Sequence, residues 1–276
     1  MNGQITRIIS DLYTVKIDNM LYGCRARGVF RQKGITPLVG DQVIVDTDKN
    51  IIVKVLPRKN ELKRPVIANV DIALIVTSVK EPNLDLVLLD KLISNITYND
   101  IEPVIIFTKI DLLSEESLKS IESLKEYYEI IGIKVFYNTE LTEIKKYIKS
   151  KIVVLAGQSG AGKSSLINKL DNRYTIETNE ISKALGRGKH TTRHVELYDI
   201  EDALVADTPG FSSLDLSTID KDELKNTFIE FKNYECKFRD CLHHKEKECG
   251  VKEAVENKKI LETRYNNYIK FLEEIK

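Results

Sequence analysis

The sequence predicts a multidomain α/β protein with a β-rich N-terminal part, a central part of alternating strands and helices, and a helical C-terminal part. Three observations predict it. Short β-prone runs separated by turn residues fill positions 1 to about 62, strands and helices alternate from about 66 to 212, and a helical pattern with embedded cysteines follows 220. A chain of 276 residues has room for two or three such units.

Composition favours a soluble protein. Hydrophobic residues make up 42% of the chain and charged residues 30%. No apolar run is long enough to cross a bilayer, and the N-terminus MNGQITRIIS lacks the apolar segment of a secretion signal. We therefore expect a cytoplasmic protein with no membrane partner, and nothing in the sequence indicates more than a monomer.

The N-terminal part predicts a small antiparallel barrel. Strands are expected at residues 3–9, 12–17, 20–26, 41–46 and 50–56. Such spacing is typical of an OB-fold, and OB-folds often bind oligonucleotides, so residues 1–62 are interpreted as an RNA-binding domain. The segment PRKNELKRP at 57–65, with a proline at each end, is interpreted as a linker.

Charge is unevenly distributed along a chain whose formal net charge is zero. Residues 1–64 hold twelve Lys/Arg against six Asp/Glu, a local balance of +6. This indicates a phosphate-rich partner, with an ordinary solvated basic face as an equally weighted alternative.

The central part predicts a parallel sheet covered by helices. Strands are expected at 71–79, 103–108, 133–138 and 151–156, and helices at 84–96, 114–131 and about 141–149. In such a fold the ligand binds at the carboxyl ends of the strands.

A phosphate-binding loop, GQSGAGKSS, follows the strand expected at 151–156 and matches G-x-x-x-x-G-K-[ST]. Its backbone N–H groups would surround phosphate oxygens, Lys163 would reach the β and γ phosphates, and Ser164 would ligate Mg²⁺. The alternative is a chance glycine-rich turn. The predicted nucleotide-binding residues of the loop are Gly157, Gln158, Ser159, Gly160, Ala161, Gly162, Lys163, Ser164 and Ser165.

A second motif, ALVADTPGF, places Asp-x-x-Gly at the end of an apolar strand forty-odd residues later. Asp207 would hold the magnesium through water, and the Gly210 N–H would face the γ-phosphate.

The base-reading motif is expected in TKID, which lies upstream of the phosphate loop. Asp111 can accept from guanine N1–H and the exocyclic amine together, a pair that adenine does not offer. Lys109 would pack along the purine, Ile110 lies between them, and Thr108 stands where Asn is commoner and is expected to loosen the pocket. YNTEL at 137–141 is either a second base contact or an ordinary strand-to-helix turn. Either TKID is accidental or the chain is a circularly permuted GTPase.

The C-terminal part carries a metal motif, C-x4-C-x-H-x5-C, within fourteen residues. The motif predicts a closed, structural zinc site, one per chain, with the ligands Cys236, Cys241, His243 and Cys249. His244 is an alternative ligand by proximity. Cys24 is left over and is expected to be a buried thiol. The last helical stretch either packs on the protein or presents a partner-binding face that includes Tyr265, Tyr268 and Leu272.

In this order the segments resemble the ribosome small-subunit-dependent GTPases of bacteria, the RsgA or YjeQ family, over essentially the whole length. The resemblance implies a circularly permuted GTPase domain at 66–215 and a helical zinc-binding domain at 216–276. It further implies slow hydrolysis of GTP to GDP, stimulated by the small (30S) subunit, and a role in late maturation of that subunit through its 16S rRNA. The family's zinc pattern matches His243.

A water-orienting group is expected in GRGKHTTRH, residues 186–194, because Phe211 follows the Asp-x-x-Gly glycine where many GTPases have Gln. His190 could position or activate water, a role that the resemblance supports. The alternative is that His190 contacts RNA or stabilises the loop. Thr191 or Thr192 would complete the magnesium contacts, and spacing does not say which.

Two rival functions stay open. A P-loop ATPase or kinase is opposed by Asp111, and a non-enzymatic RNA-binding adaptor is kept in view by Phe211. The chain also runs from the DTPG motif directly into the zinc part. We therefore expect that loss of the γ-phosphate contact could move that part.

Overall fold

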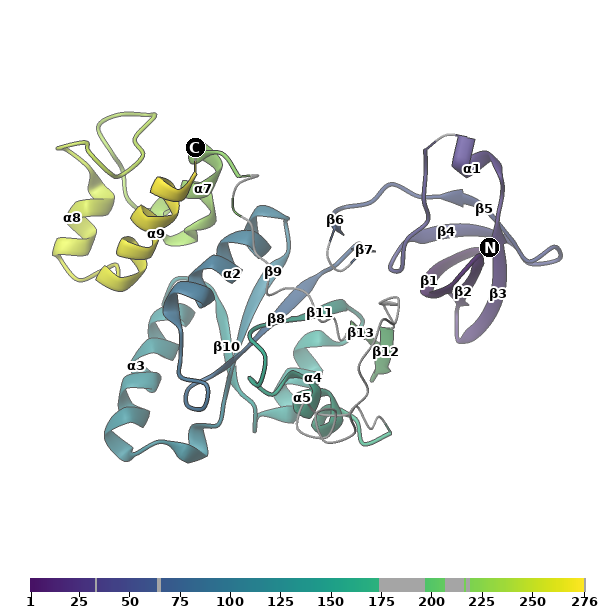
Figure 1. Cartoon of the computed structure of the whole chain (residues 1–276), viewed down its shortest axis with the longest axis horizontal. Coiled ribbons are helices and arrows are strands. Elements are labelled where there is room, and N and C mark those ends of the chain that lie inside the picture. The colour runs from purple at the N-terminus through teal and green to yellow at the C-terminus, as the bar shows by residue number, and fades with distance from the viewer. Residues whose placement is uncertain (33, 64–65, 174–196, 207–215, 217–218, 276) are drawn as a thin grey trace. The chain divides into compact units, whose positions relative to one another are not determined.

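The structure is a computed structural model that describes residues 1–32, 34–63, 66–173, 197–206, 216 and 219–275 (Figure 1). The chain forms two compact units. One comprises Met1–Leu74, Thr139–Ala156 and Gly162–Phe211, and the other comprises Ile75–Asn138, Gly157–Ala161 and Ser212–Lys276.

The N-terminal strands close into a barrel in the order β1-β2-β3-β5-β4. The strands are β1 (Asn2–Ile9), β2 (Leu12–Ile17), β3 (Met20–Ala26), β4 (Gln42–Asp46) and β5 (Ile51–Val55), with one turn of helix, α1 (Val29–Gln32), after β3. Apart from the parallel pair β3–β5, neighbouring strands are antiparallel. Alternate side chains such as Ile5, Val15 and Ile52 are fully buried, and so is the Cys24 thiol, as predicted.

The segment after the barrel is not the simple linker that its prolines predict. It contains β6 (Glu61–Lys63), which pairs antiparallel with β7 (Val66–Ala68). Arg58 donates through Nε and Nη2 to the two carboxylate oxygens of Asp41, both at 2.7 Å, and Asp41 is fully buried. The two parallel hydrogen bonds from Arg58 to Asp41 join residues 17 positions apart. The proline pattern gives no signal for this contact or for β6.

The central sheet has six strands in the order β10-β9-β8-β11-β13-β12. These are β8 (Ile72–Ser78), β9 (Glu102–Thr108), β10 (Lys134–Tyr137), β11 (Ile152–Ala156), β12 (Leu197–Ile200) and β13 (Ala203–Ala206). β9–β10 and β11–β13 are parallel, and β12 is an antiparallel edge. Every residue of β8, β11 and β13 is buried, as expected of strands covered on both faces.

Four helices follow strands of this sheet: α2 (Leu86–Tyr98), α3 (Glu115–Ile130), α4 (Leu141–Ile148) and α5 (Lys163–Leu170). Side chains cap two of them, because Asp85 accepts from the Leu88 N–H at 3.0 Å and Ser114 from the Ser117 N–H at 3.4 Å. The strands and helices predicted between residues 71 and 156 are all present.

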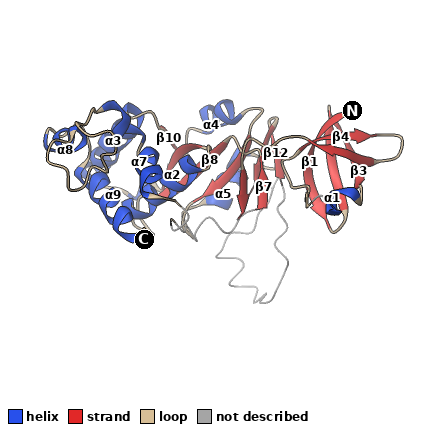
Figure 2. Ribbon diagram, turned by 90° about the horizontal axis from the view of Figure 1, so that it is seen from above, coloured by secondary structure: helices blue, strands red, loops and turns tan. Residues whose placement is uncertain are grey.

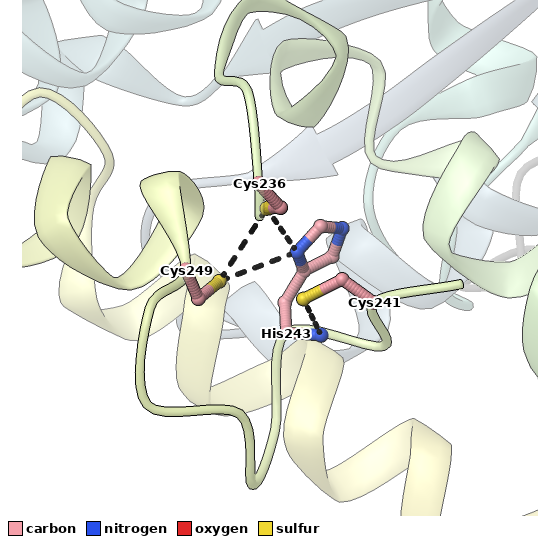
Figure 3. Close-up of side chains that lie close together, drawn as sticks. All are labelled: Cys236, Cys241, His243 and Cys249. Atoms are coloured by element: carbon pink, nitrogen blue, oxygen red, sulfur yellow. Dashed lines mark hydrogen bonds between the residues drawn. The ribbon is translucent and has the colours of Figure 1, made fainter. Parts of the chain in front are cut away.

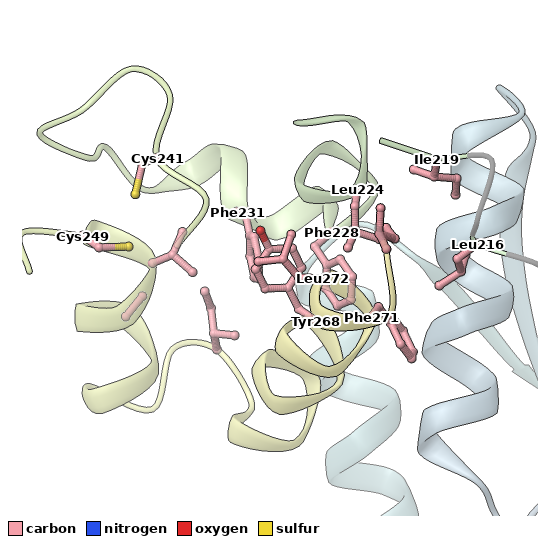
Figure 4. Close-up of a cluster of buried hydrophobic side chains, with 14 residues drawn as sticks. Leu216, Ile219, Leu224, Phe228, Phe231, Cys241, Cys249, Tyr268, Phe271 and Leu272 are labelled. Carbon is pink, nitrogen blue, oxygen red and sulfur yellow. The ribbon is translucent and has the colours of Figure 1, made fainter. Parts of the chain in front are cut away.

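The C-terminal part is helical with long loops, in contrast to the strands of the barrel (Figure 2). It contains α7 (Lys221–Thr227), the 3₁₀ helix η2 (Ile229–Asn233), α8 (Gly250–Glu256) and α9 (Glu262–Glu274). Phe228, Phe231, Tyr268 and Phe271 form the centre of its apolar cluster, which also takes in Cys241 and Cys249 (Figure 4). In the described part of the chain, the helices are all too short or too polar to span a bilayer.

Candidate functional site

The base-reading motif begins where β9 ends. Thr108 is the last residue of this buried strand, and the chain then turns sharply, with Lys109 at φ +61° and a 3₁₀ turn, η1 (Ile110–Leu112). The turn leaves Asp111 exposed beside the carboxyl end of β9. An exposed carboxylate at this edge of a parallel sheet is placed as a guanine-reading group requires.

Thr108 ties this motif to the phosphate loop inside the same compact unit. Its hydroxyl lies 2.7 Å from the Ala161 carbonyl oxygen and 3.5 Å from that of Thr77, and only 2% of the residue is exposed. Because a buried hydroxyl donates one hydrogen, the shorter contact is the principal bond. The geometry therefore gives Thr108 a bracing role between the two motifs, and the expected loosening of the guanine pocket stays a prediction.

The loop after β8 is a part of the site that sequence reasoning missed. The Lys109 ammonium donates to the Glu81 carbonyl, and the Lys80 ammonium donates to the Leu112 carbonyl at 2.9 Å. The Gln158 side-chain amide reaches the Asn83 carbonyl at 3.4 Å. The loop thus contacts both the base motif and the phosphate loop through backbone oxygens, which leave no residue-type signal in a sequence.

The phosphate loop has the backbone that its glycines predict. Gly157, Gly160 and Gly162 have φ values of +125°, +78° and +98°. A Cβ on Gly157 would stand 2.0 Å from the Val76 carbonyl oxygen, so a side chain is excluded there by both space and conformation. Gly162 leads into α5, so Lys163 and Ser164 are the first residues of that helix. A curled, glycine-rich turn entering a helix is the cradle that an anionic phosphate needs.

The metal motif assembles as a compact cluster (Figure 3). Ligand atoms of Cys236, Cys241, His243 and Cys249 all lie within 4.8 Å of one another. The His243 Nδ1 is 3.4 Å from the sulfurs of both Cys236 and Cys249. His244 points elsewhere, with its Nε2 3.8 Å from Glu273. The structure therefore selects His243 over His244.

The surroundings of the cluster fit a bound dication. Burial lowers the pKa of His243 to about 4, which keeps its imidazole neutral, as metal ligation requires. Burial and the neighbouring thiols raise the pKa of Cys241 to about 12, and burial also raises that of Cys249. Thiolates crowded this closely need a positive charge between them, and three sulfurs with one imidazole are a zinc set.

Two tyrosines of α9 hold the ligand loop by its backbone. The Tyr265 hydroxyl donates to the His243 carbonyl at 2.7 Å, and the Tyr268 hydroxyl donates to the Leu242 carbonyl at 2.6 Å. The face of the last helix that includes these tyrosines therefore packs on the protein. Of the two alternatives given for this face, packing and partner binding, the structure supports packing. The tyrosines orient the loop that carries His243, the kind of outer support that metal ligands need.

Other predicted site residues lie outside the described residues. These are His190, Thr191, Thr192, Asp207 and Gly210.

The turn at 137–141 was predicted to be either a second base contact or an ordinary strand-to-helix turn. The Asn138 N–H donates to the Phe107 carbonyl at 2.9 Å, which extends the β9–β10 pairing, and α4 begins at Leu141. A base contact from this turn stays a prediction.

Comparison with known proteins gives consistent matches. A family model described as RsgA GTPase matches residues 55–217, and one described as RsgA N-terminal domain matches residues 2–51. A protein of Oceanobacillus iheyensis named small ribosomal subunit biogenesis GTPase RsgA 2 is 50% identical over 283 residues, which cover 99% of this chain and 97% of that protein. A protein of Clostridium beijerinckii named small ribosomal subunit biogenesis GTPase RsgA is 45% identical over 285 residues, covering 100% and 97%.

Solved structures give the same match. YjeQ from Thermotoga maritima has a TM-score of 0.88 at 35% identity, over 99% of this chain and 98% of that one. YloQ, described as a circularly permuted GTPase, has a TM-score of 0.86 at 38% identity, over 99% and 94%.

Proposed function

Because this chain belongs to the RsgA family of circularly permuted GTPases, we propose that it hydrolyses GTP on the small ribosomal subunit and assists late maturation of that subunit. The chain is a GTP hydrolase. The ribosomal role rests on the similarity to RsgA proteins, and the observation that supports nucleotide binding is the hydrogen bond between Thr108 and Ala161, because it joins the guanine-reading motif to a phosphate loop that comes later in the sequence. A P-loop ATPase or kinase would have no use for Asp111 at this position.

Each predicted site residue contacts the part of the nucleotide, or the magnesium ion, that suits its chemistry. Asp111 accepts from guanine, the N–H groups of Gly157–Ser165 surround the phosphates, and Lys163 neutralises β and γ oxygens. Ser164 and Asp207, with Thr191 or Thr192, would hold Mg²⁺, which when bound offsets the charge that develops on the phosphate oxygens. Gly210 would contact the γ-phosphate.

For hydrolysis, we assign His190 the role of orienting the attacking water. Phe211 has no group that could do so, and an imidazole titrates near neutral pH in an unperturbed setting. This assignment rests on the sequence and the family resemblance.

We further propose one structural zinc per chain, held by Cys236, Cys241, His243 and Cys249, with no coordination position left for substrate. The barrel, whose sequence carries the +6 balance of residues 1–64, would contact 16S rRNA. Domain boundaries at 1–62, 66–215 and 216–276, a monomeric state and a cytoplasmic location complete the proposal.

The test is the rate of phosphate release from GTP, with and without purified small ribosomal subunits, for wild type and His190→Ala. Stimulation of wild type that is lost in the variant, with GTP binding intact, is the expected result. Stimulation that survives in His190→Ala would remove the catalytic assignment and keep the partner. A wild type that binds subunits without stimulation would favour an RNA-binding adaptor, and equal affinity for GTP and ATP would overturn the guanine assignment.

A further inference from the structure

Arg264 on α9 is the largest fully buried side chain among the described residues, with 1% of its surface exposed. Its guanidinium donates to two carboxylates at once. Nε and Nη2 donate to the two oxygens of Glu230 on η2 at 2.5 and 3.0 Å, and Nη1 donates to Asp90 on α2 at 2.5 Å. A helix of the zinc-binding part is thereby joined to a helix of the nucleotide-binding part, inside one compact unit.

Further donors complete the coordination of Asp90. The Asn267 side-chain amide donates to Asp90 Oδ2 at 2.7 Å, and the Tyr128 hydroxyl donates to Asp90 Oδ1 at 3.1 Å. Asn267 comes from α9 and Tyr128 from α3, so three helices meet at this carboxylate. The guanidinium also lies over the rings of Phe228 and Tyr128, at 4.8 and 5.6 Å from their centroids.

The second carboxylate has a similar link to α3. The Tyr127 hydroxyl lies 3.4 Å from Glu230 Oε1, and it also accepts from the Leu261 N–H just before α9 at 3.4 Å. Asp90 and Glu230 are each 1% exposed. Separating either carboxylate from the guanidinium would leave a buried group without its charge partner, which is costly. The contacts of Arg264 with Asp90 and Glu230 are called the latch below.

The helices held by this latch both begin at the nucleotide site. α3 follows the TKID turn, and α2 follows the loop whose Glu81 carbonyl accepts from Lys109. Apolar packing runs beside the latch, since Val87 and Tyr98 of α2 lie against the cluster of Phe228, Phe271 and their neighbours. Both helices therefore connect the zinc-binding part with turns at the nucleotide site.

We propose that Arg264 is a positioning residue that fixes the zinc-binding part on α2 and α3, so that a subunit bound to the zinc-binding part acts on the nucleotide site through these helices. The inference rests on the proposed function, because it concerns how the ribosomal subunit stimulates hydrolysis. It also limits the expected hinge motion of the zinc-binding part, which would have to carry α2 and α3 with it or open the latch.

The test compares Arg264→Gln with a matched control, Lys91→Met. Lys91 on α2 forms a partly exposed ion pair, 3.6 Å long, with Glu274 on α9, so the control removes an ion pair between the same two helices. For Arg264→Gln we expect subunit-stimulated phosphate release to fall about tenfold or more, while release without subunits stays within about twofold of wild type. Lys91→Met should behave as wild type in both assays. Zinc content at one ion per chain is measured in parallel.

A charge-neutral triple variant, Asp90→Asn with Glu230→Gln and Arg264→Met, keeps the test valid if Arg264→Gln fails to fold. It removes the latch without leaving a buried unpaired charge, and the same loss of stimulation is expected. The inference is overturned if a folded, zinc-loaded variant keeps full stimulation, or if release falls equally with and without subunits.

A second readout separates this inference from the proposed function. If wild type itself shows no stimulation, the proposed function fails, and amide exchange still tests the latch. Opening it should raise exchange in both α9 and the first half of α2 in Arg264→Gln relative to Lys91→Met. Unchanged exchange in α2 would overturn the positioning role.

Discussion

The barrel and the zinc-binding part are held together in opposite ways. The barrel closes its backbone hydrogen bonds on itself and fills its interior with aliphatic side chains such as Ile5, Val15 and Ile52. The zinc-binding part has two helices of seven residues, which are too short to be stable alone, with three cysteines and a histidine in the segment between them. A buried arginine, Arg264, follows on α9. A small region without a large apolar core is commonly stabilised by a metal, and the zinc-binding part fits that pattern, whereas the barrel is closed by backbone pairing.

Removing the metal should have the largest effect and should affect only one of the two regions. Structural zinc sites contribute about 10–16 kcal/mol of apparent binding free energy. A strong chelator should therefore unfold the segment around residues 236–256 while the barrel strands keep their protection, as followed by amide exchange. Cys24→Ala is the control, since that buried thiol belongs to the barrel core, and it should leave zinc content unchanged. Loss of barrel protection on chelation would break the contrast between the regions.

Opening the latch is the next largest change. Arg264→Met leaves Asp90 and Glu230 buried without a counter-charge, which should lower the free energy of unfolding by about 3–5 kcal/mol. Lys91→Met, across the same helices but partly exposed, should cost at most about 1 kcal/mol. Denaturant titration of both variants measures the difference, and similar midpoints would mean that burial does not distinguish the two ion pairs.

Thr108→Val tests whether a single hydroxyl organises the nucleotide site. The variant keeps the side-chain shape and leaves the Ala161 carbonyl without its donor, at a cost of about 1–3 kcal/mol. GDP affinity, from fluorescence titration, should fall while zinc content stays the same. Affinity equal to wild type would show that the loop after β8 is sufficient to brace the site.

The smallest effect is expected in the barrel core. Ile52→Val removes one buried methylene and should lower the free energy of unfolding by about 0.5–1.5 kcal/mol. Thermal unfolding monitored at the barrel gives the value. A larger loss would indicate that the barrel depends on close packing more than on its closed hydrogen bonding.

Much of the architecture was predictable because its signals are local. Alternation over residues 12–17 and apolar runs at 103–108 and 151–156 predict strands, and the glycine spacing from Gly157 predicts the curled loop. The strand β6 within the linker at 57–65 was not predicted, because its pairing with β7 and the contact of Arg58 with Asp41 leave no signal in the proline pattern.

The spacing of the cysteines predicted the metal ligands except for the choice of histidine. His243 and His244 are adjacent in sequence, and only the fold turns the first toward Cys236 and the second toward Glu273. The ligand chemistry was thus local, whereas the ligand identity needed the path of the loop that Tyr265 and Tyr268 hold.

The sequence by itself determined the three kinds of region, the nucleotide motifs with their rotated order, and the three cysteine donors, because each signal consists of residues a few positions apart. Tertiary structure alone decided that Thr108 meets Ala161, 53 residues away, and that Arg264 meets Asp90, 174 residues away. In a helix as charged as α9, an arginine is expected on the solvated face. It is buried here because two carboxylates and two aromatic rings from other elements enclose it, and contacts between distant elements leave no periodic mark in the chain.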